Sequence, residues 1–488
     1  MAGVGVRLNQ FFKRESLAAD LVGFLYSTVI TIAPMLILIA ALVLMQSLSG
    51  FSTLEYAERA LFSCTVLYIF IFSLLTTAPF NAVLSKYLSD VIYLEKYEEI
   101  RACYDFGKTL NVAFSSLLGI PFCLYEHFVG GVRLSMVFGG FCGYIGLVLV
   151  FYSMLYLSIC KEYRRISLDY IIGMLAALLF TLIFCRWMQW NVAEGMLLAL
   201  TIGFFLIAVL EDVLIRKYFS KTSNHFRPVL EYFRKYWQLI AANTLYTLGL
   251  YIHNFVFWIT DLRMTVANSF VCNQPYDLAS CLAMLTNISA TVIFISRVEM
   301  NFHTKYRDFS DAITGGRGSD IERTTQQMFR TLSSEMMTLV RIQFIISVIL
   351  YFVCIIFLPE MGVSDMTMQI YPLLAVAYFI LFVMYYAMIF LYYYNDLQGA
   401  LLTAVVFFVI TWGGSIVSTH LPVVWYGTGL LVGALAGWCA AYGRLQWIEK
   451  HLYEHIFCEG EILPRGKGKK PPDKVFDRKN MGEEDGIS

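Results

Sequence analysis

Residues 21–48 read LVGFLYSTVITIAPMLILIAALVLMQSL, and this stretch decides the fold. It contains no charged residue, and it is longer than the roughly 20 apolar residues that a helix needs to cross a bilayer. The apolar core of a cleavable signal peptide is shorter, at about 7–15 residues. We therefore expect this stretch to remain in the protein as a first transmembrane helix, preceded by a cytoplasmic N-terminal segment, residues 1–20.

The composition of the whole chain also excludes a soluble protein. Of its 488 residues, 58% are hydrophobic and 15% are charged, and the mean hydropathy is +0.64. Soluble domains contain about 45–50% apolar and about 25% charged residues. We therefore expect the additional apolar surface to face the lipid bilayer. Lys plus Arg and Asp plus Glu both number 36, so the total charge predicts no nucleic acid partner.

Eleven further apolar runs are long enough to span a membrane. With the first run they predict twelve helices, at residues 21–48, 61–85, 109–129, 134–160, 169–190, 195–215, 237–260, 277–299, 337–358, 369–394, 400–420 and 424–443. With a cytoplasmic N-terminus, the cations left on the outer side are Arg59, Arg133, Arg186 and Arg263. Because Lys and Arg collect in cytoplasmic loops, this orientation is favoured, and both termini are expected to be cytoplasmic.

The twelve helices divide into two halves of six. The first two helices of each half begin at 21 and 61 and at 237 and 277, so both pairs are offset by the same number of residues. We expect an all-α polytopic membrane protein whose two six-helix lobes are parallel repeats around a central lumen, a known transporter plan. The predicted segments are a first lobe at 21–215, a basic cytoplasmic linker at 216–236, a second lobe at 237–443 with a long cytoplasmic connection at 300–336, and a cytoplasmic tail at 444–488.

The seventh run is too polar to face acyl chains. Polar side chains inside a span face the bundle interior or a water-filled cavity, so they either bond to neighbouring helices or line a path for substrate. The candidate path residues, from this run and three others, are Thr31, Asn81, Asn243, Tyr246, Tyr251, His253, Asn254 and Asn287. The sequence leaves both interpretations open.

Motifs for catalysis are weak or missing. His451, Glu454 and His455 match the H-x-x-E-H zinc pattern, but the pattern lacks a third ligand and a cleft, so a solvated helix beside the membrane is expected. Gly315–Ser319 reads GGRGS and lacks the G-K-[ST] ending of a phosphate loop. We expect no enzyme activity, no cofactor and no bound metal.

Cations in the predicted cytoplasmic segments are candidates for docking a partner enzyme or anionic lipid. They are Arg216, Lys217, Arg234, Lys235, Arg297 and Arg307.

Several short motifs, spread from residue 1 to about 458, resemble one family. They are MAGVGVRL at the start, Ala33-Pro34, Phe257-Trp258, Tyr276-Asp277, VIFISRVEMNF ending at Phe302, Tyr394-Asn395-Asp396, and LYEHIFC ending at Cys458. In order and spacing they resemble the Pel exopolysaccharide transporter family, PelG, within the multidrug/oligosaccharidyl-lipid/polysaccharide flippase superfamily.

The resemblance implies a multi-pass protein of the bacterial cytoplasmic (inner) membrane that moves the Pel polysaccharide, an amino-sugar polymer. It implies a cytoplasmic glycosyltransferase as a partner, together with other Pel membrane subunits, including a cyclic-di-GMP receptor. Many members carry an acidic-basic pair where this chain has His253-Asn254. A role for such an ion pair is therefore not carried over.

Three hypotheses follow. The first is a transporter or channel through which the polymer threads a polar lumen, driven by chain elongation at a bound glycosyltransferase. The second is a non-conducting membrane scaffold that anchors and activates the synthase. The third is a flippase for lipid-linked oligosaccharide, which would transport without its glycosyltransferase.

Overall fold

The computed structural model describes residues 17–94, 96–159, 163–220, 227–360 and 362–454. The N-terminal residues before Leu17, His455 of the zinc-like pattern and the tail beyond it lie outside this part of the chain. The side chains of residues 17–31, and with them the candidate path residue Thr31, also lie outside the described residues.

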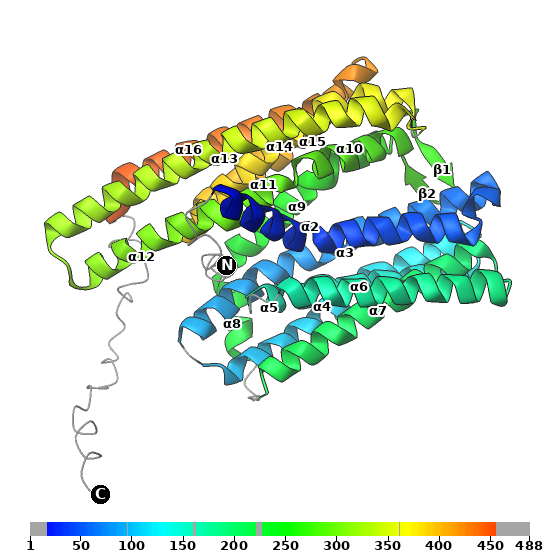
Figure 1. Cartoon of the computed structure of the whole chain (residues 1–488), viewed down its shortest axis with the longest axis horizontal. Helices are drawn as coiled ribbons and strands as arrows, with labels where there is room; N and C mark the ends of the chain where they lie inside the picture. The colour runs from blue at the N-terminus through cyan, green and yellow to red at the C-terminus, as the bar shows by residue number, and fades with distance from the viewer. Residues whose placement is uncertain (1–16, 95, 160–162, 221–226, 361, 455–488) are drawn as a thin grey trace, which may run out of the picture.

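All six helices predicted for the first half are present (Figure 1). They are α2 (Leu17–Ser49), α3 (Tyr56–Tyr93), α4 (Glu98–Phe128), α5 (Leu134–Ile159), α6 (Tyr163–Leu182) and α7 (Val192–Tyr218). A 3₁₀ turn, Phe51–Thr53, follows α2, and a π-turn, Ile183–Trp187, continues α6. Several helices run beyond the predicted apolar core, because charged side chains one turn apart pair along their ends, as Lys86 does with Asp90 at 3.0 Å.

The second half contains five of the other six predicted helices, together with additional elements. Its helices are α9 (Trp237–Phe257), α10 (Gln274–Asn287), α11 (Ser289–Ile293), α12 (Glu299–Gly315), α13 (Gly318–Glu360), α14 (Asp365–Tyr393), α15 (Leu397–Ser418) and α16 (Thr428–Glu454). A short helix, α8 (Arg227–Lys235), lies in the linker between the halves. A two-stranded antiparallel hairpin, β1 (Met264–Val266) and β2 (Phe270–Cys272), follows α9.

One expectation for the second half is wrong in detail. The span predicted at 277–299 is not one helix, because it breaks after α10 and again at a π-turn, Phe294–Val298. At the first break, Asn287 accepts a hydrogen bond from Ser347 and Ser289 donates one to Gln343, so both side chains are drawn to α13. The connection predicted at 300–336 is helical, since α12 fills its first part and α13 continues through it into the ninth span.

Eleven of the described helices, taken with the turns that continue them, are long and apolar enough to cross a membrane. Helix α9 has spanning length but is not among these eleven, because residues such as Asn243, His253 and Asn254 lower its hydropathy. Of the twelve predicted spans, the polar seventh is therefore the one that is missing from these eleven helices.

The helices form two bundles that lie side by side (Figure 1). Apolar side chains of α2 to α7, including Tyr152 and Phe204, form one core. Side chains of α9 to α16, including Tyr371 and Phe390, form two clusters of their own. The predicted two-lobed, all-α membrane fold is confirmed.

The two lobes meet along α3 and α9, which we call the seam. At one end Val83 packs against Tyr236 and Leu239. At the other end the ring of Tyr68 stacks on Trp258, with centroids 5.1 Å apart and planes at 7°. The seam therefore joins the lobes along α9 and along the middle of α3, from Tyr68 to Val83.

The hairpin crosses from the second lobe to the first at one end of the molecule, which we call the hairpin end. The hydroxyl of Tyr68 donates to the carbonyl oxygen of Val271 (2.8 Å) and accepts from its backbone N–H (3.2 Å). Ser269 donates to the carboxylate of Glu126 on α4. The predicted orientation places the hairpin end outside the cell, and α8 and α12 at the opposite, cytoplasmic end (Figure 1).

Two cysteines also face each other across the lobes. Sγ of Cys64 on α3 lies 3.1 Å from Sγ of Cys272 on β2, and both residues are buried. This contact brings together residues more than 200 positions apart in sequence.

We predict that mild oxidation links Cys64 to Cys272, because their sulfur atoms need to approach by only about 1 Å to reach disulfide distance. The measurement is mass spectrometry of linked peptides from a full-length variant that keeps these two cysteines and replaces the others by serine. In the matched control, which keeps Cys103 in place of Cys64, no link forms, because the Cys103 sulfur contacts Tyr156 instead. Absence of the Cys64–Cys272 peptide from protein that retains its thermal stability would show that the hairpin is not seated here.

An ion pair with a buried carboxylate fixes the end of the second lobe opposite the hairpin. Asp396 is 3% exposed, caps α15 by accepting from the backbone N–H of Gly399 (3.0 Å), and accepts two hydrogen bonds from Arg444 on α16 at 2.6 and 3.2 Å. A bidentate contact between arginine and a carboxylate is strong, and it fixes how the two side chains are oriented.

We predict that Arg444→Ala lowers the free energy of unfolding by about 3–5 kcal/mol, because Asp396 would be left buried without its cation. Thermal unfolding of the purified protein in nanodiscs measures this loss. The matched control is Arg227→Ala, since Arg227 and its partner Glu231 are 91% and 74% exposed, and such pairs contribute little. Equal midpoints for the two variants would contradict the assignment.

Candidate functional site

Three predicted path residues are held inside the second lobe. Nδ1 of His253 lies 2.8 Å from the hydroxyl of Tyr276, and Asn254 donates to Asp277 at 2.7 Å. Asn287 donates to the carbonyl oxygens of Ala283 and Ala375, both at 2.9 Å. All three are buried, so for them the structure supports bonding between helices rather than the lining of a path.

Asp277 is the centre of the bonds between α9 and α10. Besides Asn254, it accepts from Nε1 of Trp258 (3.0 Å) and from the backbone N–H of Asn273 (3.0 Å). Asn254 of the pair His253-Asn254 therefore bonds through its amide to a carboxylate on the next helix.

Two predicted path residues lie on the seam. Asn243 donates to the carbonyl oxygen of Ala78 on α3 at 2.6 Å, which is a bond between the lobes. Asn81, one turn further along α3, is half-buried, and its Oδ1 has no hydrogen-bond partner among the described residues. Asn81 is therefore the predicted path residue best placed to accept a hydrogen bond from a passing molecule.

The remaining two, Tyr246 and Tyr251, are half-buried on α9. The ring of Tyr246 stacks on Tyr385 of α14, with centroids 5.0 Å apart. The structure thus does not gather the predicted residues into one site, because they divide between the seam and the interior of the second lobe.

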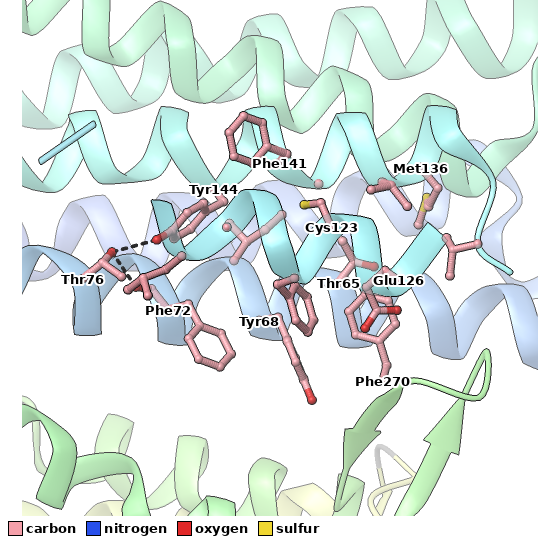
Figure 2. Close-up of a pocket in the computed structure, with 17 residues that line it drawn as sticks. Thr65, Tyr68, Phe72, Thr76, Cys123, Glu126, Met136, Phe141, Tyr144 and Phe270 are labelled. Carbon is pink, nitrogen blue, oxygen red and sulfur yellow. Dashed lines mark hydrogen bonds between the residues drawn. The ribbon is translucent and has the colours of Figure 1, made fainter. Parts of the chain in front are cut away.

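A cavity that the sequence does not reveal lies in the first lobe behind the hairpin (Figure 2). Its volume is about 340 Å³, and its walls come from α3, α4, α5 and β2. The side chains that line it include six aromatic rings, those of Tyr68, Phe72, Phe122, Phe141, Tyr144 and Phe270. Because Tyr68 also stacks on Trp258, the cavity adjoins the seam.

Each end of this cavity carries oxygen atoms. At the hairpin end Glu126 is 2% exposed; one carboxylate oxygen accepts from Ser269, and Oε1 has no partner among the described residues. At the other end the hydroxyl of Tyr144 donates to Oγ1 of Thr76 at 3.1 Å (Figure 2). Ser115 donates to the same Thr76 oxygen at 3.2 Å. The cavity therefore has aromatic walls between a carboxylate and a group of hydroxyls.

Sequence reasoning missed Glu126 and the hairpin. Glu126 is the one acidic residue in the apolar run predicted at 109–129, and such a residue in a span indicates a functional site. Its partner Ser269 could not be recognised, because it lies 143 positions away. Within the described residues, no group of three or more His, Cys, Asp or Glu is placed to hold a metal ion. His451 of the zinc-like pattern lies with Nδ1 3.0 Å from the carbonyl oxygen of Trp447.

The candidate docking cations lie on α7, α8, α12 and the π-turn before α12. Arg216 pairs with Asp212 (2.7 Å) and Asp105 (3.0 Å), and Arg297 pairs with Glu335 (3.1 Å). The other four, all exposed, are Lys217, Arg234, Lys235 and Arg307.

Solved transporter structures share this fold. The chain is similar to the structure titled "Outward-facing conformation of a multidrug resistance MATE family transporter of the MOP superfamily", with a TM-score of 0.55, 14% identity, and coverage of 92% of this chain and 100% of that one. It is also similar to the inward-facing conformation of such a transporter (TM-score 0.54, 13% identity, 83% and 95% coverage).

A third similar structure is that of a point mutant of VcmN, a MATE transporter from Vibrio cholerae (TM-score 0.60, 12% identity, 87% and 96% coverage). At these identities the likeness shows the fold alone. No curated protein matches the chain.

The family of the chain follows from its sequence as a whole. Residues 1–457 match the family model described as "PelG: Putative exopolysaccharide Exporter (EPS-E)". This match covers both lobes, the seam and the hairpin, and it confirms the resemblance carried by the short motifs. The chain is a multi-pass membrane transporter that belongs to the PelG family of exopolysaccharide exporters.

Proposed function

We propose that this protein conducts an exopolysaccharide of the Pel type across the bacterial cytoplasmic membrane, along a path between its two lobes. The observation that carries the proposal is the family match over residues 1–457, which spans a complete two-lobed transporter fold. The family match supports an exopolysaccharide as the class of substrate, and the two-lobed fold supports a route between the two helix bundles.

The proposal includes a partner. A cytoplasmic glycosyltransferase would elongate the polymer at the end that carries α8 and α12, so that each added sugar pushes the chain forward. Other Pel membrane subunits, including a cyclic-di-GMP receptor, would complete the complex. Both termini would then be cytoplasmic and the hairpin would face outward.

The described conformation is closed at the hairpin end. Tyr68, Ser269 and Glu126 join the lobes there, so a polymer that travels between the lobes has to displace the hairpin. Export on this account requires the contacts at the hairpin end to open while the lobes stay attached elsewhere.

We predict that a photo-reactive amino acid at Asn81 cross-links to nascent polymer during synthesis, because Asn81 lies on the seam with an unpaired oxygen. The cross-linked product is detected on the purified protein with a lectin or antibody against the polymer. The matched control places the same amino acid at Leu117, on the exposed face of α4 (69% exposed), where no polymer should be captured.

The outcomes separate the three hypotheses. Polymer captured at position 81 but not at 117 supports a conducting path. Polymer captured at neither position, with normal secretion, would favour the scaffold. Capture of a lipid-linked oligosaccharide at 81 in cells that lack the glycosyltransferase would favour the flippase.

We predict that reversing exposed charge on the linker and α7, with Lys217→Glu and Arg234→Glu together, lowers co-purification of the glycosyltransferase. Both side chains are exposed at the end assigned to the cytoplasm, so reversing their charge would replace attraction to an oppositely charged surface of the enzyme by repulsion. Salt screens attraction between exposed charges, so co-purification should also fall as the salt concentration rises. The matched control is Arg263→Glu, at the hairpin end. Equal recovery of the enzyme with all variants would contradict the assignment of this docking surface.

A further inference from the structure

We propose that the aromatic cavity behind the hairpin binds one pyranose unit of the exported chain, with Glu126 accepting hydrogen bonds from its hydroxyl groups. This inference rests on the proposed function, and it adds a specific site in the first lobe to the path between the lobes.

The size of the cavity fits a sugar unit rather than a length of polymer. Small-molecule sites generally occupy about 300–1,000 Å³, and this cavity, at about 340 Å³, lies at the small end of that range. It is bounded by three helices of one lobe, and Phe270 of the hairpin covers the end beside Glu126 (Figure 2). A single ring fits such a space.

The walls suit the faces of a pyranose ring. Tyr68, Phe122 and Phe270 pack against one another at the hairpin end, with ring centroids 5.1 to 5.8 Å apart. The rings of Phe72, Phe141 and Tyr144 also line the cavity. The face of an aromatic ring carries partial negative charge and packs well against polarised C–H groups. A pyranose presents such C–H groups on its flat faces.

The two ends suit the hydroxyl groups at the edge of the same ring. Oε1 of Glu126 is buried and has no partner among the described residues, and leaving such an oxygen unpaired is costly. At the opposite end the oxygen of Tyr144 donates its proton to Thr76 and retains capacity to accept. Acceptors at both ends favour a ligand that carries several hydroxyl donors.

An acyl chain of a lipid would match the apolar walls but not the ends. It would leave Oε1 of Glu126 buried without a donor, which disfavours the charged group. Of the two kinds of molecule that meet this protein, a sugar satisfies both the rings and the carboxylate.

The position of Glu126 links the site to the hairpin. Its second carboxylate oxygen accepts a hydrogen bond from Ser269 of the hairpin. A sugar that binds Oε1 therefore contacts the same side chain that bonds the hairpin to the first lobe. A sugar unit that arrives at this site would therefore act directly on the contact that has to open during export.

The test is saturation-transfer NMR on the full-length protein in phosphatidylcholine nanodiscs, with the methyl glycosides of glucose, N-acetylgalactosamine and galactosamine as probes. We expect transfer to the ring C–H protons of at least one probe when aromatic protons are irradiated. We also expect Glu126→Gln to weaken binding about tenfold or more, since hydrogen bonds to a charged group contribute about 1.5–3 kcal/mol.

The matched control is Glu194→Gln. Glu194 lies in the first turn of α7 and pairs with Arg133 (3.2 Å), away from the cavity, so binding should be unchanged. Formation of the Cys64–Cys272 link in each variant shows that the hairpin remains seated.

Two results would overturn the inference: no transfer to any probe, or equal binding by wild type, Glu126→Gln and Glu194→Gln. In either case, polymer captured at position 81 would leave the proposed export function intact. Sugar binding without capture at 81 would instead support the cavity and contradict the path between the lobes.

Discussion

The pairing of Tyr68 with the backbone of Val271 is the contact that holds the hairpin of the second lobe against the first lobe. One hydroxyl both donates to and accepts from the hairpin, while its ring stacks on Trp258. Trp258 in turn donates to Asp277, which also holds Asn254. A continuous set of contacts therefore runs from the cavity of the first lobe, through the hairpin, to the bonds between α9 and α10. Inside a membrane such polar groups have few alternative partners, so the network holds the hairpin end closed.

This network explains why the polarity of α9 does not by itself mark a path. A transmembrane helix that must bond to its own lobe, to a hairpin and to the opposite lobe needs polar side chains for each contact. His253 and Asn254 bond within the second lobe, and Asn243 bonds across the seam. Asn81 on the seam and Glu126 in the cavity each keep a side-chain oxygen without a partner among the described residues, so each can still accept a hydrogen bond from a ligand.

Much of the fold could be predicted from the sequence, because lipid imposes length and hydropathy on every span. Eleven of the twelve helices, the two halves and the family followed from those patterns and from short motifs. The hairpin could not be predicted, since its strands have three residues each and its turn uses Ala267 and Asn268 at positive φ rather than the usual Asn-Gly pair. The partners of His253 and Glu126 were equally hidden, because they lie 23 and 143 positions away and no pattern in a single sequence pairs such residues. The break at Asn287 follows from bonds to α13 and α14 that hydropathy does not report.

On the proposed function, polymer leaves between the lobes, past the hairpin. This route is tested most directly by measuring secretion of the polysaccharide from cells in which Cys64 and Cys272, the two retained cysteines, are linked by oxidation and then released by a reductant. The account predicts that secretion stops while the hairpin is fastened to α3 and resumes on reduction, whereas a Cys64→Ser variant under the same treatment continues to secrete. Undiminished secretion from protein that is fully cross-linked would contradict it.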